Sequence, residues 1–170
     1  MRWLVDGYNV IRRDPELAAR EGESLQAGRE ALCRLLSTAA RLSGDQFSVV
    51  FDGDRGGGSM SGGLGVRVIF SSGRERADTV LARQATAGGT VVSNDREVRD
   101  AAMRAGAIAV GADEFLARLR KAARPRAPVK DEDDDTPTLP KKGNPRRLPK
   151  KKRAADRALR RLDRGFLKWW

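Results

Sequence analysis

The sequence contains no histidine and only one cysteine, and each absence removes a class of functional site. Without histidine, the chain cannot form a Ser-His-Asp triad, use a histidine general base or bind a metal through imidazole. One cysteine excludes an internal disulfide and a cysteine-rich zinc site. Because Cys33 lies among helically spaced apolar residues, we expect it to be a thiol of the core.

Lysine is absent from residues 1–120, so this part of the chain lacks the lysine of a Walker motif and the amine of a Schiff-base enzyme. No apolar run approaches the roughly 20 residues of a membrane span, and the N-terminus lacks the basic-then-apolar pattern of a signal peptide. The sequence therefore predicts a cytoplasmic protein without a membrane partner. Its chemistry must depend on carboxylates, amides, hydroxyls and arginines.

The 170-residue chain has a formal net charge of +11 and a pI near 10.7, and this charge is unevenly placed. Residues 1–120 carry 17 arginines against 16 acidic residues, whereas residues 121–170 carry 17 basic residues against 7 acidic ones. Strongly basic chains favour polyanionic partners, either nucleic acid or an anionic membrane surface. The partition predicts a folded domain over residues 1–123 and a basic C-terminal part.

Apolar runs alternate with amphipathic segments along the first 123 residues. Buried strands are predicted at residues 2–5, 47–51, 66–70, 90–93 and 107–110. Helical periodicity, with glycine after several segments, predicts helices at residues 25–42, 77–87, 97–105 and 112–123. Strand–helix alternation with short connections predicts an α/β domain whose mainly parallel sheet is flanked by helices.

Four aspartates lie at or just beyond the carboxyl ends of predicted strands: Asp6, Asp52, Asp78 and Asp95. Because these ends meet at one edge of a parallel sheet, we expect the four side chains to converge there, with Asn9 one turn beyond Asp6. Clustered carboxylates repel each other unless protons or a cation neutralise them, and Mg²⁺ or Mn²⁺ suits oxygen ligands. Taken one at a time, each residue is more typical of a turn or a helix N-cap.

Other polar features near this edge have more than one interpretation. Arg74 and Arg76, close to Asp78, are either phosphate-binding residues or exposed arginines on a solvated turn. The glycine-rich residues 53–65 precede a strand and have no following lysine, which excludes a P-loop and a dinucleotide-binding loop. We interpret them as a flexible loop that faces the substrate. An aspartyl phosphatase is a second interpretation of Asp52, but the lysine and the nearby hydroxyl that such enzymes use are missing.

Several motifs together resemble those of the NYN domain, a branch of the PIN-like nucleases. They are "LVDGYNVI", "VVFDGD", "ERADTVLA", "VVSNDREV" and "GAIAVGADEFLARL". Their order and spacing are most similar to those of the bacterial YacP-like group, over about residues 1–120. The first motif and "ADTVL" are the most specific of them.

This resemblance implies a Rossmann-like PIN fold and a metal-dependent endoribonuclease that hydrolyses RNA phosphodiester bonds. One studied branch of the YacP-like group cleaves mRNA in association with ribosomes, so RNA and the ribosome are the implied partners. By matching position, the implied catalytic residues and ligands of Mg²⁺ or Mn²⁺ are Asp6, Asp78 and Asp95, with Asn9 and Asp52 in support.

The basic C-terminal part has a different composition. Residues 124–150 combine prolines, an acidic run and basic clusters with few apolar side chains, which predicts a disordered linker. Residues 151–170 predict a short basic helix that binds RNA or the ribosome, the alternatives being a solubilising tail and an amphipathic membrane anchor. The apolar side of this helix is formed by Ala155, Ala158, Leu159 and Leu162.

A second class of function is compatible with the same residues. In a catalytically inactive RNA- or ribosome-binding module with a PIN-like fold, the aspartates would serve only as caps and turn residues. The two classes differ in one observable, the cleavage of labelled RNA in the presence of Mg²⁺ or Mn²⁺ and its loss in EDTA.

Overall fold

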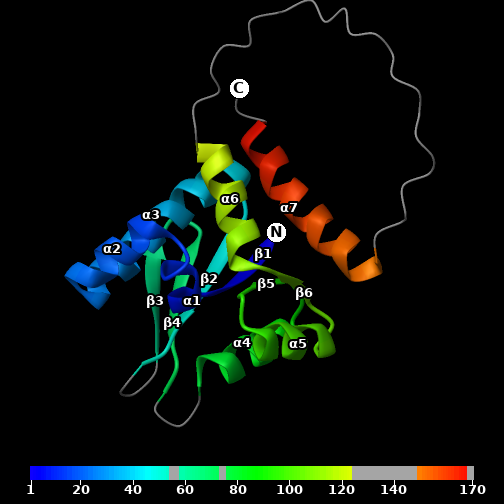
Figure 1. Ribbon diagram of the computed structural model, residues 1–170, viewed down its shortest axis with the longest axis horizontal. Helices are drawn as coiled ribbons and strands as arrows, with labels where there is room; N and C mark the ends of the chain where they lie inside the picture. The colour runs from blue at the N-terminus through cyan, green and yellow to red at the C-terminus, as the bar shows by residue number, and fades with distance from the viewer. Residues whose placement is uncertain (54–57, 73–75, 124–148, 168–170) are drawn as a thin grey trace, which may run out of the picture.

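The computed structural model describes residues 1–53, 58–72, 76–123 and 149–167, in which one sheet lies between two layers of helices (Figure 1). Its strand order is β3-β4-β2-β1-β5-β6. All neighbouring strands pair in parallel except β3, which is antiparallel to β4. The strands are β1 (Arg2–Asp6), β2 (Gln46–Phe51), β3 (Gly58–Gly63), β4 (Val66–Phe70), β5 (Thr90–Val92) and β6 (Ile108–Val110). The predicted α/β class with a mainly parallel sheet is confirmed.

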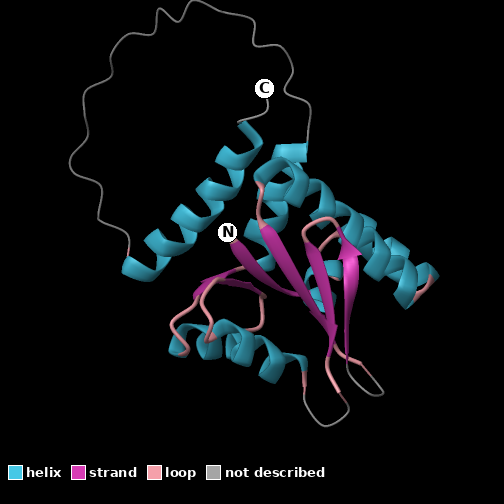
Figure 2. Cartoon of the chain, turned by 180° about the vertical axis from the view of Figure 1, so that it is seen from behind, coloured by secondary structure: helices cyan, strands magenta, loops and turns pink. Residues whose placement is uncertain are grey.

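The helices divide between the two faces of this sheet (Figure 2). They are α1 (Gly7–Ile11), α2 (Pro15–Glu23), α3 (Leu25–Ser43), α4 (Ala77–Ala85), α5 (Arg96–Arg104), α6 (Ala112–Ala123) and α7 (Lys150–Leu167). Trp3 and Val5 of β1 pack in the cluster that includes α2, α3 and α6, whereas Leu4 packs with α4 and α5. Successive side chains of the buried strand β1 therefore point to opposite faces of the sheet and contribute to the apolar core on each face.

Two helices that the sequence analysis did not predict follow β1. α1 begins directly after the strand, and α2 has Asp14 as its N-cap with Pro15 at the first helical position. Within α2, Leu17 is the buried residue, so this helix has almost no apolar periodicity to detect. The N-cap followed by proline was the available signal for α2.

The prediction of a loop throughout the glycine-rich segment was wrong, because β3 occupies Gly58–Gly63. Glycine has low strand propensity, so composition argued against a strand here. Close packing requires a glycine at position 62, because a Cβ there would lie 2.9 Å from Val66 and Val68 side-chain atoms and 3.1 Å from the Cys33 sulfur. Cys33 itself is buried in the core, as predicted.

The C-terminal helix α7 lies against α3, α6 and β6 (Figure 1). The predicted apolar side is correct: Ala158, Leu159 and Leu162 are at most 4% exposed. The predicted linker lies outside the described residues except for Pro149 and Lys150, and Lys150 is already the first residue of α7. Within the described part of the chain, no helix has the length and apolar character needed to cross a membrane.

A buried carboxylate connects the start of α2 to α6. Asp14 is 2% exposed, and its Oδ1 accepts hydrogen bonds from the backbone N–H groups of Glu16 at 3.0 Å and Leu17 at 3.2 Å. Arg120 Nε donates to Asp14 Oδ2 at 2.7 Å. Burial by itself raises the pKa of Asp14, but the hydrogen bonds from Arg120 and Leu17 outweigh it and hold the pKa below its usual value.

We expect Asp14→Asn to lower the free energy of unfolding at pH 7 by about 1–3 kcal/mol, because a buried, charge-assisted hydrogen bond is lost. With a depressed folded-state pKa, the contribution of Asp14 is present above the unfolded-state value of about 3.9 and is lost as the pH falls through the folded-state pKa. The difference between the two proteins should therefore shrink below about pH 4, which urea unfolding at several pH values measures.

Glu16→Gln is the matched control for this prediction. Glu16 Oε1 lies 3.0 Å from Arg120 Nη1, but its side chain is 80% exposed, so the change should cost less than about 0.5 kcal/mol. A deficit of Asp14→Asn that stayed constant between neutral and acid pH would contradict the assigned pKa direction.

Candidate active site

Asp6 is the last residue of β1 and the N-cap of α1, so it joins a central strand to the first helix. Its Oδ1 accepts a hydrogen bond from the backbone N–H of Asn9 at 3.3 Å, and its Oδ2 accepts one from the Ser93 hydroxyl at 2.9 Å. Gly7 permits this tight connection, because a Cβ there would lie 2.2 Å from Phe51 Cε1. Asp6 is thus held at the carboxyl edge of the sheet.

Asn9 and Ser93 link α1 to the segment that follows β5. The Oδ1 of Asn9 accepts a hydrogen bond from the backbone N–H of Asn94 at 2.8 Å. Ser93 is fully buried, and besides donating to Asp6 it accepts a hydrogen bond from the backbone N–H of Asp95 at 3.0 Å. These bonds tie the segment that contains Asp95 to the end of β1 and the start of α1.

Asp95 and Asp78 lie at the starts of α5 and α4, on the other face of the sheet from α1. Asp95 is the N-cap of α5, and its Oδ1 accepts hydrogen bonds from the backbone N–H groups of Glu97 at 2.7 Å and Val98 at 3.4 Å. Asp78 lies in the first turn of α4 with its side chain 41% exposed. α5 follows β5 and α4 follows β4, and both strands run in the same direction as β1.

Asp52 follows β2 and supports the start of α4. Its Oδ1 accepts hydrogen bonds from the Ser71 hydroxyl at 2.9 Å and from the backbone N–H of Ala77 at 3.0 Å. The Ser71 hydroxyl is buried and also accepts a hydrogen bond from the backbone N–H of Gly53 at 3.2 Å. Asp52 therefore helps to hold the helix on which Asp78 lies, while its part in catalysis stays a prediction.

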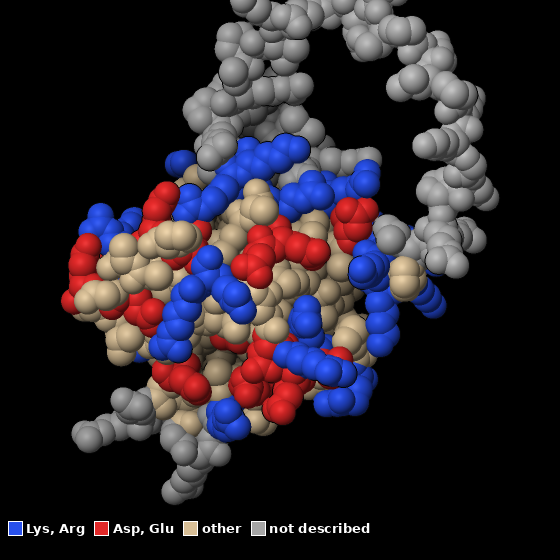
Figure 3. All heavy atoms as spheres, viewed as in Figure 1, with Lys and Arg blue, Asp and Glu red and all other residues tan. Residues whose placement is uncertain are grey.

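The carboxylates at this edge act on one another electrostatically. Burial raises the pKa of Asp6, and the charges of Asp78 and Asp95 raise it further, against the hydrogen bonds from Ser93 and Asn9. Burial likewise raises the pKa of Asp78, and the charge of Asp95 adds to the effect. Acidic side chains gather over the region of α4 and α5 in Figure 3. The structure thus brings Asp6, Asp78 and Asp95 to one edge, as predicted.

The donor set at this edge suits a hard divalent cation, since it consists of carboxylate, amide and hydroxyl oxygens. In the described residues, no three acidic or cysteine side chains are grouped closely enough to form a ready-made metal site. Mg²⁺ keeps several of its waters and needs only one or two carboxylates, so the residues still fit such an ion. Binding of the ion by Asp6, Asp78 and Asp95 together stays a prediction.

The sequence matches the YacP-like NYN domain family over residues 3–162. The chain belongs to this family. It is a family of PIN-like nucleases, so the resemblance found in the sequence motifs is confirmed. The match extends into α7, well past the predicted domain end at residue 123. The division of the NYN protein into three segments stays a prediction, because residues 124–148 lie outside the described range.

Two solved structures are similar to this NYN protein. A single-substitution mutant of Rae1 (YacP) from Bacillus subtilis is 27% identical, with a TM-score of 0.62, over 71% of this chain and 75% of that chain. Rae1 (YacP) from Bacillus subtilis is 25% identical, with a TM-score of 0.59, over 71% of this chain and 74% of that chain. No curated protein sequence matches the chain.

Of the two arginines predicted to bind substrate, the structure describes only Arg76. Arg74 lies outside the described residues. The Arg76 side chain is 84% exposed, and its Nη2 lies 3.8 Å from Asp78 Oδ2, where it lowers the pKa of that carboxyl against the effect of burial. Arg76 therefore accompanies a predicted metal ligand, and its contact with a substrate phosphate stays a prediction.

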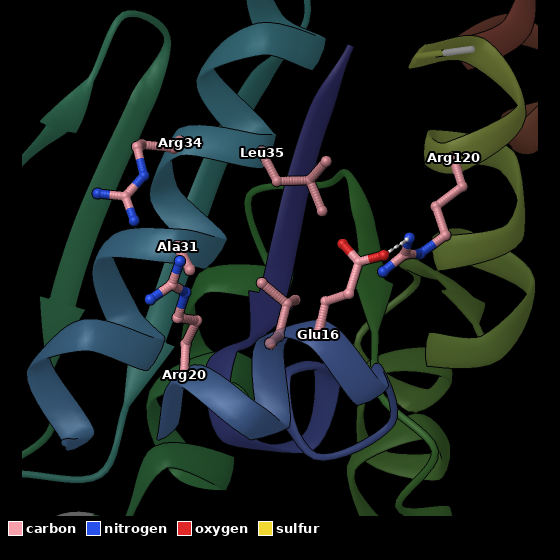
Figure 4. A pocket seen from close by; sticks show the side chains of 7 residues that line it. Glu16, Arg20, Ala31, Arg34, Leu35 and Arg120 are labelled. Atoms are coloured by element: carbon pink, nitrogen blue, oxygen red, sulfur yellow. Dashed lines mark hydrogen bonds and ion pairs between the residues drawn. The ribbon is translucent and has the colours of Figure 1, made fainter. Parts of the chain in front are cut away.

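A pocket of about 380 Å³ lies elsewhere in the NYN protein, between α2, α3 and α6 (Figure 4). Its arginines are paired with glutamates: Arg120 Nη1 lies 3.0 Å from Glu16 Oε1, and Arg34 Nη1 lies 3.8 Å from Glu30 Oε2. None of the predicted site residues lines it. The lining residues are Glu16, Leu17, Arg20, Ala31, Arg34, Leu35 and Arg120. The pocket is therefore separate from the edge of the sheet that carries Asp6, Asp78 and Asp95, which we call the acidic edge.

Sequence reasoning missed two serines that orient the aspartates. Ser93 directly follows β5, and Ser71 directly follows β4, in the runs "TVVS" and "VIFS". A hydroxyl directly after a mostly apolar strand was the available signal, because such a residue is often buried and then needs a hydrogen-bond partner.

Proposed function

We propose that this NYN protein is a metal-dependent endoribonuclease that hydrolyses phosphodiester bonds of RNA, with mRNA on the ribosome among its substrates. The observation that carries the proposal is the position of Asp6, Asp78 and Asp95 at or after the carboxyl ends of β1, β4 and β5, on one edge of the sheet. Burial raises the pKa of Asp6 and of Asp78, and the neighbouring carboxylates add to the effect. Such a cluster is unfavourable in its ionised form unless a cation is bound. Membership of a PIN-like nuclease family supports the same conclusion.

Asp6, Asp78 and Asp95 are the residues that would hold Mg²⁺ or Mn²⁺. When bound, a divalent cation polarises a phosphoryl oxygen and lowers the pKa of a bound water. The residues around it orient the ligands: Ser93 and Asn9 hold the segment between Asp6 and Asp95. Since the chain has no histidine, proton transfer at this edge would fall to its carboxylates and to water.

The exposed side of α7 supports a polyanionic partner such as RNA or ribosomal RNA. Exposed basic residues are numerous on this helix, whose apolar side packs on the core. They are Lys150, Lys151, Lys152, Arg153, Arg157 and Arg160. Cationic side chains on an exposed helix bind nucleic acid by releasing counterions from phosphates, which makes the affinity dependent on salt.

Purified protein with Mg²⁺ or Mn²⁺ is expected to cleave labelled RNA, free or on ribosomes, and an excess of EDTA is expected to stop the cleavage. Restoration of activity by added metal after EDTA is the control for irreversible damage. Cleavage that persists in EDTA would contradict the metal dependence. Absence of cleavage on both substrates would favour the second function below.

A catalytically inactive RNA-binding module is the second candidate function, and a specific observation favours it. Asp6, Asp52 and Asp95 each hold the start of a helix through hydrogen bonds to backbone N–H groups. Those bonds are what carboxylates in purely structural roles make. The module would bind RNA with the same salt dependence but show no cleavage with any divalent cation.

A further inference from the structure

Arg29 of α3 lies among three aromatic rings beside the acidic edge. Its Cζ is 5.4 Å from the ring centroid of Tyr8, 5.5 Å from that of Phe51 and 5.2 Å from that of Phe70. Its Nε donates to the Tyr8 hydroxyl oxygen at 2.9 Å, and its Nη2 donates to the same oxygen. Cation–π contacts of this kind hold a guanidinium in place without neutralising its charge.

The charge of Arg29 has no carboxylate partner among the residues that the structure describes. Arg34, on the same helix, lies 3.8 Å from Glu30, and Arg12, which lies 5.2 Å from the Tyr8 ring centroid, pairs with Glu21 at 3.2 Å. Arg29 is half-buried and meets rings and a hydroxyl instead. A partly desolvated guanidinium of this kind is a strong binding site for an anion.

The three rings connect Arg29 directly to the proposed active site. Phe51 precedes Asp52 in the chain, and Tyr8 lies two residues after Asp6. Phe70 precedes Ser71, whose hydroxyl donates to Asp52. The rings of Phe51 and Phe70 are stacked with centroids 6.0 Å apart, and the Tyr8 ring meets Phe51 edge-on at 5.1 Å. Arg29 therefore flanks the carboxyl ends of β1, β2 and β4 on the side covered by α3.

We propose that Arg29 and the Tyr8 hydroxyl form a subsite that binds a phosphate of the RNA strand next to the phosphate that is cleaved. The proposal rests on the proposed function, because the strand must also reach the acidic edge. An approaching polyanion is repelled by the aspartates, and a fixed cation beside them offsets that repulsion. Arg29 is a binding residue in this account, separate from the residues that would hold the metal.

The hydrogen-bonding capacity of the pair suits a phosphate. The Tyr8 oxygen accepts from Arg29, so its own O–H remains available to donate to a phosphate oxygen. Arg29 retains N–H groups beyond those bonded to Tyr8, and guanidinium N–H groups bind phosphate in paired geometry. Because the rings already hold the guanidinium, little side-chain freedom is lost when the phosphate binds.

Binding of a labelled single-stranded RNA oligonucleotide to the full chain in EDTA tests the subsite without cleavage. Arg29→Met keeps apolar contact with the rings and is expected to weaken binding by about 10- to 100-fold. It should also flatten the plot of log K against log[salt] by about 0.7, the value for one phosphate on a single strand. Tyr8→Phe, which removes only the hydroxyl, is expected to weaken binding less, by about threefold to tenfold.

Arg34→Met is the matched control, since it removes the same charge from the same helix, from a side chain that lies in the pocket away from the acidic edge (Figure 4). Its effect on RNA affinity should be less than about twofold, as for an exposed and paired charge. The double variant Arg29→Met/Tyr8→Phe should lose less affinity than the two single losses combined, because both groups contact one phosphate.

Two outcomes would overturn the subsite while leaving the proposed function intact. In the first, the unchanged chain binds and cleaves RNA, and both Arg29→Met and Tyr8→Phe bind RNA with the same affinity as the unchanged chain. In the second, Arg29→Met and Arg34→Met lose the same RNA affinity, which would mean that Arg29 contributes only through the net charge of the protein. Failure of the proposed function is distinct, since the unchanged chain would then bind RNA without cleaving it, and Arg29→Met would still weaken that binding.

Discussion

Asp6→Asn is expected to lower the rate of RNA cleavage by about 10³-fold or more, which corresponds to roughly 4 kcal/mol of lost transition-state stabilisation. The Asp6 carboxylate lies at the end of β1, bonded to Ser93 and under the influence of Asp78 and Asp95. It is therefore the central ligand of the proposed cation site, and a neutral amide binds a hard cation poorly. Initial rates on labelled RNA with Mg²⁺ or Mn²⁺ measure the effect.

The same substitution is expected to leave the free energy of unfolding at pH 7 unchanged or higher. Burial and the neighbouring charges raise the folded-state pKa of Asp6. A raised carboxyl pKa means that stability falls as the pH rises from the unfolded-state value of about 3.9 to the folded-state pKa. Asp6→Asn removes that loss while keeping an oxygen that can cap α1. Thermal unfolding with and without added metal shows whether the inactive variant remains folded.

Asp78→Asn and Asp100→Asn complete the design. Asp78→Asn should lower the rate of RNA cleavage, as Asp6→Asn does. Asp100 lies on α5 in an exposed pair with Arg96 at 3.7 Å, so Asp100→Asn removes an acidic charge away from the edge and should preserve activity. Full activity in both Asp6→Asn and Asp78→Asn would show that this edge is not a nuclease site.

Leu162→Ala is expected to lower the free energy of unfolding by about 2–5 kcal/mol, the usual cost of truncating a fully buried leucine. Leu162 is 0% exposed in α7, beside Ala158 and Leu159 at 3% and 4%. These side chains belong to the same core cluster as Leu36 and Leu119. Urea unfolding of the full chain, followed by a far-ultraviolet signal, measures the change.

Lys152→Ala in the same helix is the control, because Lys152 is exposed and its replacement should change stability by less than about 0.5 kcal/mol. Equal and small effects of both substitutions would show that α7 does not pack on the domain in solution. If α7 does pack, deleting residues 124–170 uncovers an apolar surface as well as removing positive charge. Alanine substitutions of exposed basic residues on α7 are then the cleaner measure of its contribution to RNA affinity.

The architecture was predictable where apolar residues were dense and continuous. The run "FSVVF" became β2, and helical periodicity identified α3 within one residue of its ends. β3 and α2 were missed for opposite reasons. In β3, Gly62 packs closely against Val66 and Val68, where a side chain would not fit, and α2 buries little apolar surface. Both elements depend on the neighbours that they meet, which local propensity does not contain.

The amino-acid sequence alone specifies which chemistry is available and at which edge of the sheet it lies. It contains carboxylates and no histidine, and it places Asp6, Asp78 and Asp95 at or after the ends of strands that run in parallel, so strand direction alone brings them to the same edge of the sheet. The YacP-like identity was likewise carried by short motifs.

How these carboxylates are held, and what lies beside them, depends on the three-dimensional arrangement of the elements. The bond from Ser93 to Asp6 spans 87 positions, and that from Arg29 to Tyr8 spans 21. Such contacts depend on how strands and helices are brought together in space, and a single sequence carries no signal for pairs at that separation. The packing of α7 on the domain could not be predicted for the same reason. Its apolar side was predicted from the sequence, but the surface that covers this side is formed by α3, α6 and β6.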